Sequence, residues 1–161
     1  MEVNADWGYY NAISNGGDIP KQWRVLSMQE WTYLFEHNKW TMGIVAGTLC
    51  FLLIPDNVSD LVEISSDGED SCNFTLSDYE SNSLTAEQFQ MFESQGVVAL
   101  PCGGYRTGSS VNDVGIEGCY WSSSANESGN AYKFCFNSEG VYASSLGRRF
   151  CGFSVRLVQD V

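Results

Sequence analysis

The sequence predicts an α+β domain in which two short helices precede an antiparallel sheet with long loops. Two capping boxes, each followed by apolar residues at helical spacing, predict helices near residues 27–38 and 85–96. Short apolar and aromatic runs in the C-terminal third predict strands there. At 161 residues, the chain is long enough for one domain with a hydrophobic core and too short for two, so we expect a single domain over residues 1–161.

The first predicted helix begins at Ser27. The Ser27 hydroxyl and the Glu30 carboxylate, three residues later, are placed to satisfy backbone N–H groups of the first turn. The spacing of the apolar residues that follow predicts one buried stripe, made of Met28, Trp31, Leu34 and Phe35. We expect the helix to end at His37 or Asn38.

The second predicted helix begins after Thr85, whose partner in the capping box is Gln88. Phe89 and Phe92 form its apolar face. Gly96 suits the left-handed position that commonly follows a helix.

Five segments have the length and composition of strands: residues 49–54, 97–100, 119–123, 131–136 and 153–158. The run at 49–54 is continuously apolar, which favours a strand covered on both faces. In 131–136 the aromatic side chains alternate with Lys133 and Cys135, so the aromatic face is predicted to be core, namely Tyr132, Phe134 and Phe136. In 153–158 the same alternation predicts one face made of Phe153, Val155 and Leu157.

Three other regions are predicted to lack regular structure. Residues 56–83 are acidic and rich in Ser, Asp and Asn, with short strands at most near 61–64 and 72–76, and residues 103–118 form a second long loop. Residues 138–151 mix small residues with Tyr, Arg and Phe at no regular period. That composition is typical of binding loops, where aromatic side chains supply contact area and Ser and Gly adapt to the ligand.

The charge of the chain limits its partners. The net charge is -12, and no Lys or Arg occurs between Lys39 and Arg106, so nucleic acids and anionic lipids are not expected to bind. No apolar run approaches the roughly 20 residues that cross a bilayer, so no membrane insertion is expected. The last third carries four cationic residues that could meet an acidic ligand locally: Lys133, Arg148, Arg149 and Arg156.

The six cysteines are scattered, and their pairing stays open. No CxxC spacing occurs and His37 is the single histidine, so no zinc site is expected. Asn112-Asp113 lacks the companion motif of a calcium-dependent sugar site. We therefore expect no metal and no other cofactor. Cys50 is predicted to be a small buried hydrophobe, because it lies inside an apolar run.

Five blocks of the sequence resemble the C-type-lectin-fold domains of gut bacterial and phage proteins, which are related in fold to formylglycine-generating enzymes. In chain order they are WRVLSMQEWTYLF at 23–35, LLIPD at 52–56, LPCGGYRTG at 100–108, YWSSS at 120–124 and GFSVRLV at 152–158. The resemblance spans nearly the whole chain. It implies a C-type lectin fold in which the N- and C-termini lie close together and the C-terminal strands display a binding face, here within 103–158.

Many members of this family are similar to the variable proteins of diversity-generating retroelements. There, an error-prone reverse transcriptase rewrites adenines in the repeat that encodes the C-terminal segment. Lys133 and Glu139 are not outcomes of such rewriting, and Phe134 is predicted to be core. The resemblance implies a ligand-binding surface made of Cys119, Cys135, Gly140, Tyr142, Ser144, Ser145, Gly147, Arg149, Phe150 and Cys151.

The expected function is therefore recognition or adhesion without catalysis, with an unknown protein or surface ligand as partner and a monomeric state. Two alternatives stay open. One is an oxidase similar to formylglycine-generating enzymes, in which Cys135 and Cys151 would hold copper. The other is a surface adhesin with no diversified site. The first residues contain no basic and apolar export signal, so we expect a domain trimmed from a longer protein that acts outside the cell, at a cell surface or on a virion.

Overall fold

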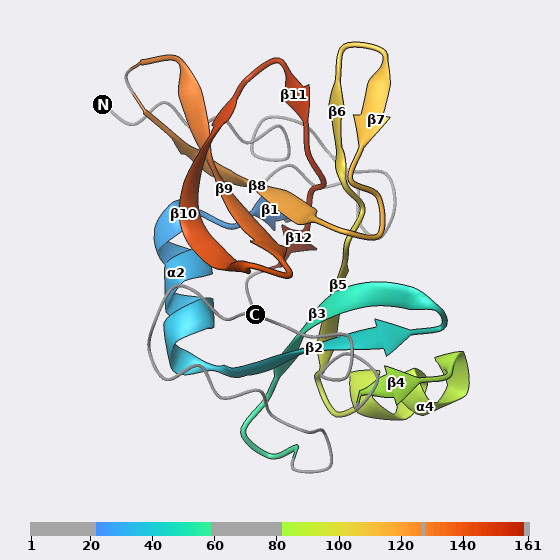
Figure 1. Ribbon diagram of the computed structural model, residues 1–161. Helices are drawn as coiled ribbons and strands as arrows, with labels where there is room; N and C mark the ends of the chain where they lie inside the picture. Colours follow the sequence, from blue (N-terminus) through green and yellow to red (C-terminus); the bar gives the residue numbers. More distant parts are fainter. Residues whose placement is uncertain (1–21, 59–81, 127, 160–161) are drawn as a thin grey trace.

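The computed structural model describes residues 22–58, 82–126 and 128–159 (Figure 1). These residues form two helices and a set of mostly antiparallel sheets. The predicted α+β class is thus confirmed. The short strands predicted near 61–64 and 72–76 lie outside the described residues.

The first helix, α2 (Met28–His37), has the predicted capping box and ends at Asn38. The Glu30 backbone N–H donates to the Ser27 hydroxyl, and the Ser27 N–H donates to the Glu30 carboxylate. Of its predicted stripe, Trp31 is the fully buried member.

The second helix, α4 (Ala86–Glu93), begins with the reciprocal bonds of Thr85 and Gln88 and ends at Ser94. Its side chains Phe89 and Phe92 are half-buried against a small apolar cluster. Gly96 has a φ of 98°, the left-handed conformation that was predicted for it.

One sheet has the strand order β4-β2-β3-β5. Its members are β2 (Lys39–Val45), β3 (Thr48–Ile54), β4 (Ser83–Leu84) and β5 (Val98–Pro101). The β3 strand confirms the predicted apolar segment, and Cys50 is buried as expected. Sequence patterns did not indicate β2, which pairs with β3 along its whole length across a turn at Ala46 and Gly47.

A second sheet has the order β10-β9-β8, all antiparallel, with β10 at its edge. Its strands are β8 (Gly118–Ala125), β9 (Asn130–Asn137) and β10 (Gly140–Arg148). The prediction of irregular structure over 138–151 was wrong, because most of this segment is β10. The period of 2 is hidden for two reasons. The covered positions carry small residues, Ala143, Ser145 and Gly147, and a bulge shifts the register between Tyr142 and Ser145.

The remaining strands tie the chain together. In a small sheet, β11 (Cys151–Gly152) pairs with β6 (Tyr105–Thr107), which pairs with β7 (Ser110–Asn112). The predicted loop over 103–118 therefore contains a hairpin. Near the two ends of the described chain, β1 (Arg24–Val25) pairs antiparallel with β12 (Leu157–Val158).

The strand predicted at 153–158 is regular only at β12. Before it, the backbone of Ser154 bonds to β8, accepting from the Trp121 N–H and donating to the Cys119 carbonyl. The chain then leaves β8 for β1, so the predicted apolar face does not form and Val155 is 52% exposed.

The core is a cluster of aromatic rings between α2, the sheet of β2 and β3, and the sheet of β8 and β9. Phe134 and Phe136 are 1% and 0% exposed, as predicted, whereas Tyr132 is only half-buried. Phe51 from β3 meets both rings, at centroid distances of 5.3 and 5.2 Å. Within the described residues, neither helix has the length and apolar character needed to span a bilayer.

Candidate binding surface

The edge strand β10 alternates between exposed and covered positions after Val141, which is buried. Exposed residues are Tyr142, Ser144, Leu146 and Arg148, while Ala143 and Ser145 are half-buried and Gly147 is buried. Because of the bulge, Tyr142 lies opposite Cys135 and Leu146 lies opposite Tyr132. Cys135 and Tyr132 belong to opposite faces of β9, so Tyr142 and Leu146 also belong to opposite faces of the sheet. The helix α2 lies beside β10 at this free edge (Figure 1).

Gly147 is part of the scaffold rather than of the binding surface. A Cβ atom at this position would lie 2.6 Å from a ring atom of Phe153 and 3.0 Å from the ring of Trp121. Those two rings pack edge to face, with centroids 4.5 Å apart. Only the missing side chain lets β10 approach them, so the expectation that Gly147 contacts ligand is corrected.

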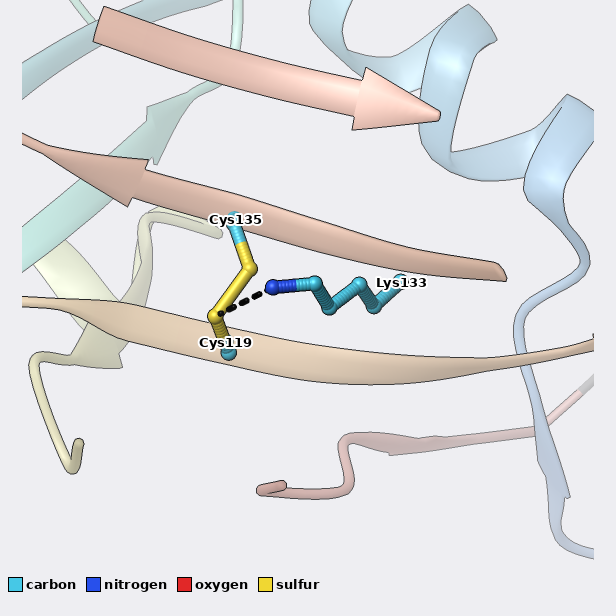
Figure 2. The surroundings of a disulfide bond; sticks show 3 residues. All are labelled: Cys119, Lys133 and Cys135. Atoms are coloured by element: carbon cyan, nitrogen blue, oxygen red, sulfur yellow. Dashed lines mark hydrogen bonds between the residues drawn. A yellow bond between two sulfur atoms is a disulfide. The ribbon is translucent and has the colours of Figure 1, made fainter. Parts of the chain in front are cut away.

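Cys119 and Cys135 are joined by a disulfide that links register partners on β8 and β9, with Cα atoms 4.3 Å apart (Figure 2). The two residues are 0% and 2% exposed. Both were expected on the binding surface, and their burial places them in the scaffold instead. Gly140 is also buried, at the start of β10.

The Lys133 ammonium covers this disulfide. It lies 3.4 Å from the Cys119 sulfur, as Figure 2 shows, and 4.7 Å from the centre of the Phe153 ring. Burial lowers the pKa of Lys133, and the nearby Glu117 carboxylate acts in the opposite direction. Burial also raises the pKa of Glu117, while Lys133 opposes that shift. Lys133 therefore places a half-buried cation between the disulfide and the ring of Phe153, with the Glu117 carboxylate nearby.

The Glu117 carboxylate and the two sulfurs lie within 4.8 Å of one another, a spacing that could hold a metal ion if the thiols were free. The sulfurs are bonded to each other, so they are not thiolate ligands. This set of atoms does not support a metal centre in the oxidised protein.

A hollow of about 300 Å³ lies between α2 and β10. The helix contributes Thr32, Phe35 and Glu36, and the strand contributes residues 142–145. Sequence patterns had placed Phe35 in the core and had not indicated Thr32 or Glu36. No local signal could have found them, because the hollow exists only where the helix meets the edge strand.

The turn between β10 and β11 carries the most exposed apolar side chain of this region, Phe150, at 66%. The Arg148 guanidinium lies 5.8 Å from the centre of its ring. Arg149 is exposed and Cys151 is half-exposed. Of the predicted surface residues, the structure thus exposes at least in part Tyr142, Ser144, Ser145, Arg149, Phe150 and Cys151. Leu146, which is 49% exposed, was not predicted to be on this surface, although it lies between two residues that were, Ser145 and Gly147.

The other described thiols are buried and poorly ionised. Burial raises the pKa of Cys50 to about 11 and that of Cys102 to about 12. A thiol needs its ionised form to act as a nucleophile or metal ligand, so neither is poised for chemistry. Cys135, one of the two thiols that a copper oxidase would require, is held in the disulfide.

These features define an α+β domain with a buried aromatic core and an exposed edge strand near its C-terminus. By sequence, the chain belongs to DUF8237, a domain family of unknown function whose model matches residues 62–158, more than half of the chain. Neither the curated proteins nor the solved structures include a match to it.

Proposed function

We propose that this domain is a recognition module that binds a protein or cell-surface ligand through its C-terminal edge, without catalysing a reaction. The observation that carries the proposal is the division of β10. Its covered positions pack on the scaffold, as Gly147 does against Phe153, while Tyr142, Ser144 and Leu146 are exposed. Exposed side chains on a well-packed support form a preorganised surface, which reduces the entropy cost of binding.

The fold proposed is that of C-type lectins. Two observations support it: the pairing of β1 with β12, which brings segments near both ends of the chain together, and the order of the five sequence blocks. In this proposal, the domain is a variable protein of a diversity-generating retroelement. Residues that would change freely are those outside the scaffold, whereas Cys119, Cys135, Gly140 and Gly147 would be kept.

The proposed location is outside the cell, at a cell surface or on a virion. The buried disulfide supports it, because disulfides persist in oxidising compartments and are rare in the cytosol. The proposed partner is a protein or surface ligand rather than nucleic acid, and the proposed state is a monomer.

The gene itself offers the most direct test. We expect a reverse-transcriptase gene nearby and a second, near-identical repeat that differs only at adenines of codons for exposed residues such as Tyr142, Ser144 and Phe150. A repeat whose adenine differences fall on buried codons such as that of Val141 would contradict the proposal. If no repeat exists, a static surface adhesin becomes the better account.

The oxidase alternative has its own test. Purified protein incubated with copper and a cysteine-containing peptide should show no peptide oxidation above that of the Cys135→Ala and Cys151→Ala variants. Turnover that those two substitutions abolish would establish the enzyme and reject the binding module.

A further inference from the structure

Three exposed arginines come together where the β10–β11 turn meets the β6–β7 hairpin. They are Arg106 on β6, Arg148 at the end of β10, and Arg149 in the turn. The pairing of β11 with β6 brings these distant parts of the sequence to one side of the domain, where Figure 1 shows the turn and the hairpin next to each other. We call these three residues, together with Phe150, the arginine edge.

The backbone register positions Arg106. Its Cα partner on β11 is Gly152, and its Cα partner on β7 is Val111. The stem of Arg106 lies over Gly152, because a Cβ atom built there would be 3.3 Å from the Arg106 Cβ and 4.0 Å from its Cγ and Cδ. Val111 is 56% exposed. Arg106 thus lies between Gly152, which has no side chain, and Val111, whose apolar side chain is exposed.

The second half of the arginine edge combines charge with an aromatic ring. The Arg148 guanidinium lies over the ring of Phe150, and this ring is itself two-thirds exposed. Arginine and aromatic side chains, Phe included, are enriched at protein interfaces relative to the rest of the surface.

These guanidinium groups have no acidic partner in the described part of the chain: none of Arg106, Arg148 and Arg149 forms an ion pair with a carboxylate there. This cationic edge contrasts with the acidic character of the whole protein. The protein carries a net charge of -12 with eight Lys and Arg residues in all, and three of the eight lie at this edge. An exposed, unpaired group of arginines is where an anionic ligand would find complementary charge.

Building on the proposed function, we propose that the arginine edge binds an acidic segment of a partner protein, in which carboxylates alternate with apolar or aromatic side chains. The planar guanidinium group donates two parallel N–H···O hydrogen bonds to a carboxylate. Phe150 and Val111 supply apolar surface that a simple polyanion would leave unused. The net negative charge of the domain disfavours extended polyanions, but carboxylates of the domain that lie well beyond the screening length of about 8 Å oppose a short acidic segment at this edge only weakly.

The test uses three short fluorescent peptides: one alternating Glu and Phe, one alternating Gln and Phe, and one alternating Glu and Ser. Fluorescence anisotropy should show binding of the Glu/Phe peptide at least about tenfold tighter than binding of either control peptide. Arg106→Ala and Arg149→Ala should each weaken it by at least about fivefold, a larger loss than most interface residues cause when truncated. The matched control is Arg156→Ala, an exposed arginine near β12, which should leave the affinity unchanged.

A footprint provides a second readout at the site itself. Cys151 is half-exposed and follows Phe150, whereas Cys50 and Cys102 are buried. In a Cys72→Ser background, saturating Glu/Phe peptide should slow the alkylation of Cys151 several-fold. An unchanged alkylation rate would place the peptide elsewhere and overturn the proposal.

Other outcomes would also overturn it. Equal binding of the Glu/Phe and Gln/Phe peptides would mean that the carboxylates are not recognised, and unchanged affinity in both arginine variants would remove the arginine edge from the site. Self-association that Arg149→Ala abolishes would identify the acidic occupant as a second copy of this chain. A gene repeat marking codons 142 and 144 combined with failed peptide binding would reject this inference and leave the proposed function standing.

Discussion

The indole ring of Trp31 stacks on the ring of Phe134, with centroids 4.8 Å apart and planes 5° from parallel. Trp31 comes from α2 and Phe134 from β9, so this stack holds the helix against the sheet whose edge is β10. The indole N–H also donates to the carbonyl of Trp121, at 3.4 Å. The contacts of Trp31 therefore hold α2, which borders the hollow, in place. The exposed side chains of β10 take no part in these contacts.

Removal of this stack should destabilise the whole domain. Trp31→Ala should lower the free energy of unfolding by about 3–5 kcal/mol, because it leaves a cavity between helix and sheet. Tyr33→Ala is the matched control on the same helix: Tyr33 is 59% exposed, so its loss should cost less than about 1 kcal/mol. Urea unfolding followed by tryptophan fluorescence measures both, and equal effects would show that the stack is not a central support.

Gly147 should tolerate no side chain. Gly147→Ala forces a methyl group against Phe153 and Trp121 and should cost about 1–3 kcal/mol, the usual range for overpacking. Ser144→Ala, at an exposed position on the same strand, should change the unfolding free energy by less than about 0.5 kcal/mol. Thermal unfolding compares the two variants. A neutral Gly147→Ala would mean that the segment is not packed on those rings.

The disulfide should stabilise the scaffold by closing a loop. Its cysteines are 16 residues apart, and a loop of that size is worth about 3 kcal/mol. The Cys119→Ala, Cys135→Ala double variant should lose about that much unfolding free energy while keeping its circular dichroism spectrum. Mass spectrometry of an unreduced digest should find the peptide that contains Cys119 joined to the peptide that contains Cys135. Free thiols at both positions in protein prepared under oxidising conditions would contradict this assignment.

The ion pair of Arg24 and Glu30 should make stability depend on pH. Burial alone would raise the pKa of Glu30, but hydrogen bonds from Arg24 and from Ser27 outweigh it and hold the pKa below its ordinary value of 4.5. A carboxyl whose pKa is lower in the folded than in the unfolded state stabilises the protein fully at a pH above its unfolded-state pKa. That contribution is lost as the pH falls through and below 4.5.

We therefore expect Glu30→Gln to be less stable than the unsubstituted protein at pH 7, with the difference shrinking toward zero in acid. Both side chains are about a third exposed, so the difference at pH 7 should stay below about 1 kcal/mol. Chemical unfolding at pH 7 and at pH 3 measures it. Glu36→Gln removes one carboxylate from the exposed face of α2 and is the matched control for the change in net charge. A difference that grows as the pH falls would reverse the assigned sign.

Local patterns predicted the helices and most of the core, because capping boxes and alternating aromatic residues report local geometry. Both capping boxes form as expected, and Phe134 and Phe136 are buried. The β2 and β10 strands were missed. In β10, the lack of a side chain at Gly147 is explained by Trp121 and Phe153, which pack against that position and come from distant parts of the sequence.

The candidate surface was predicted only in part, because residue type alone does not show which side chains are exposed. Choosing residues by whether adenine rewriting could produce them selects both Tyr142, which is exposed, and Cys119, which is buried in a disulfide. What separates them is strand pairing over long sequence distances. The same pairing brings Arg106 beside the β10–β11 turn, a juxtaposition that the sequence does not announce.

The proposed function depends most on the division of β10 into exposed and covered positions. Its most direct test is a protease-resistance selection of displayed single-position libraries at Tyr142, Ser144 and Leu146, compared with libraries at Val141 and Gly147. We predict that the three exposed positions accept most amino acids with unchanged resistance, while Val141 accepts only apolar residues of similar size and Gly147 accepts almost none. Equal intolerance at exposed and covered positions would contradict the central claim.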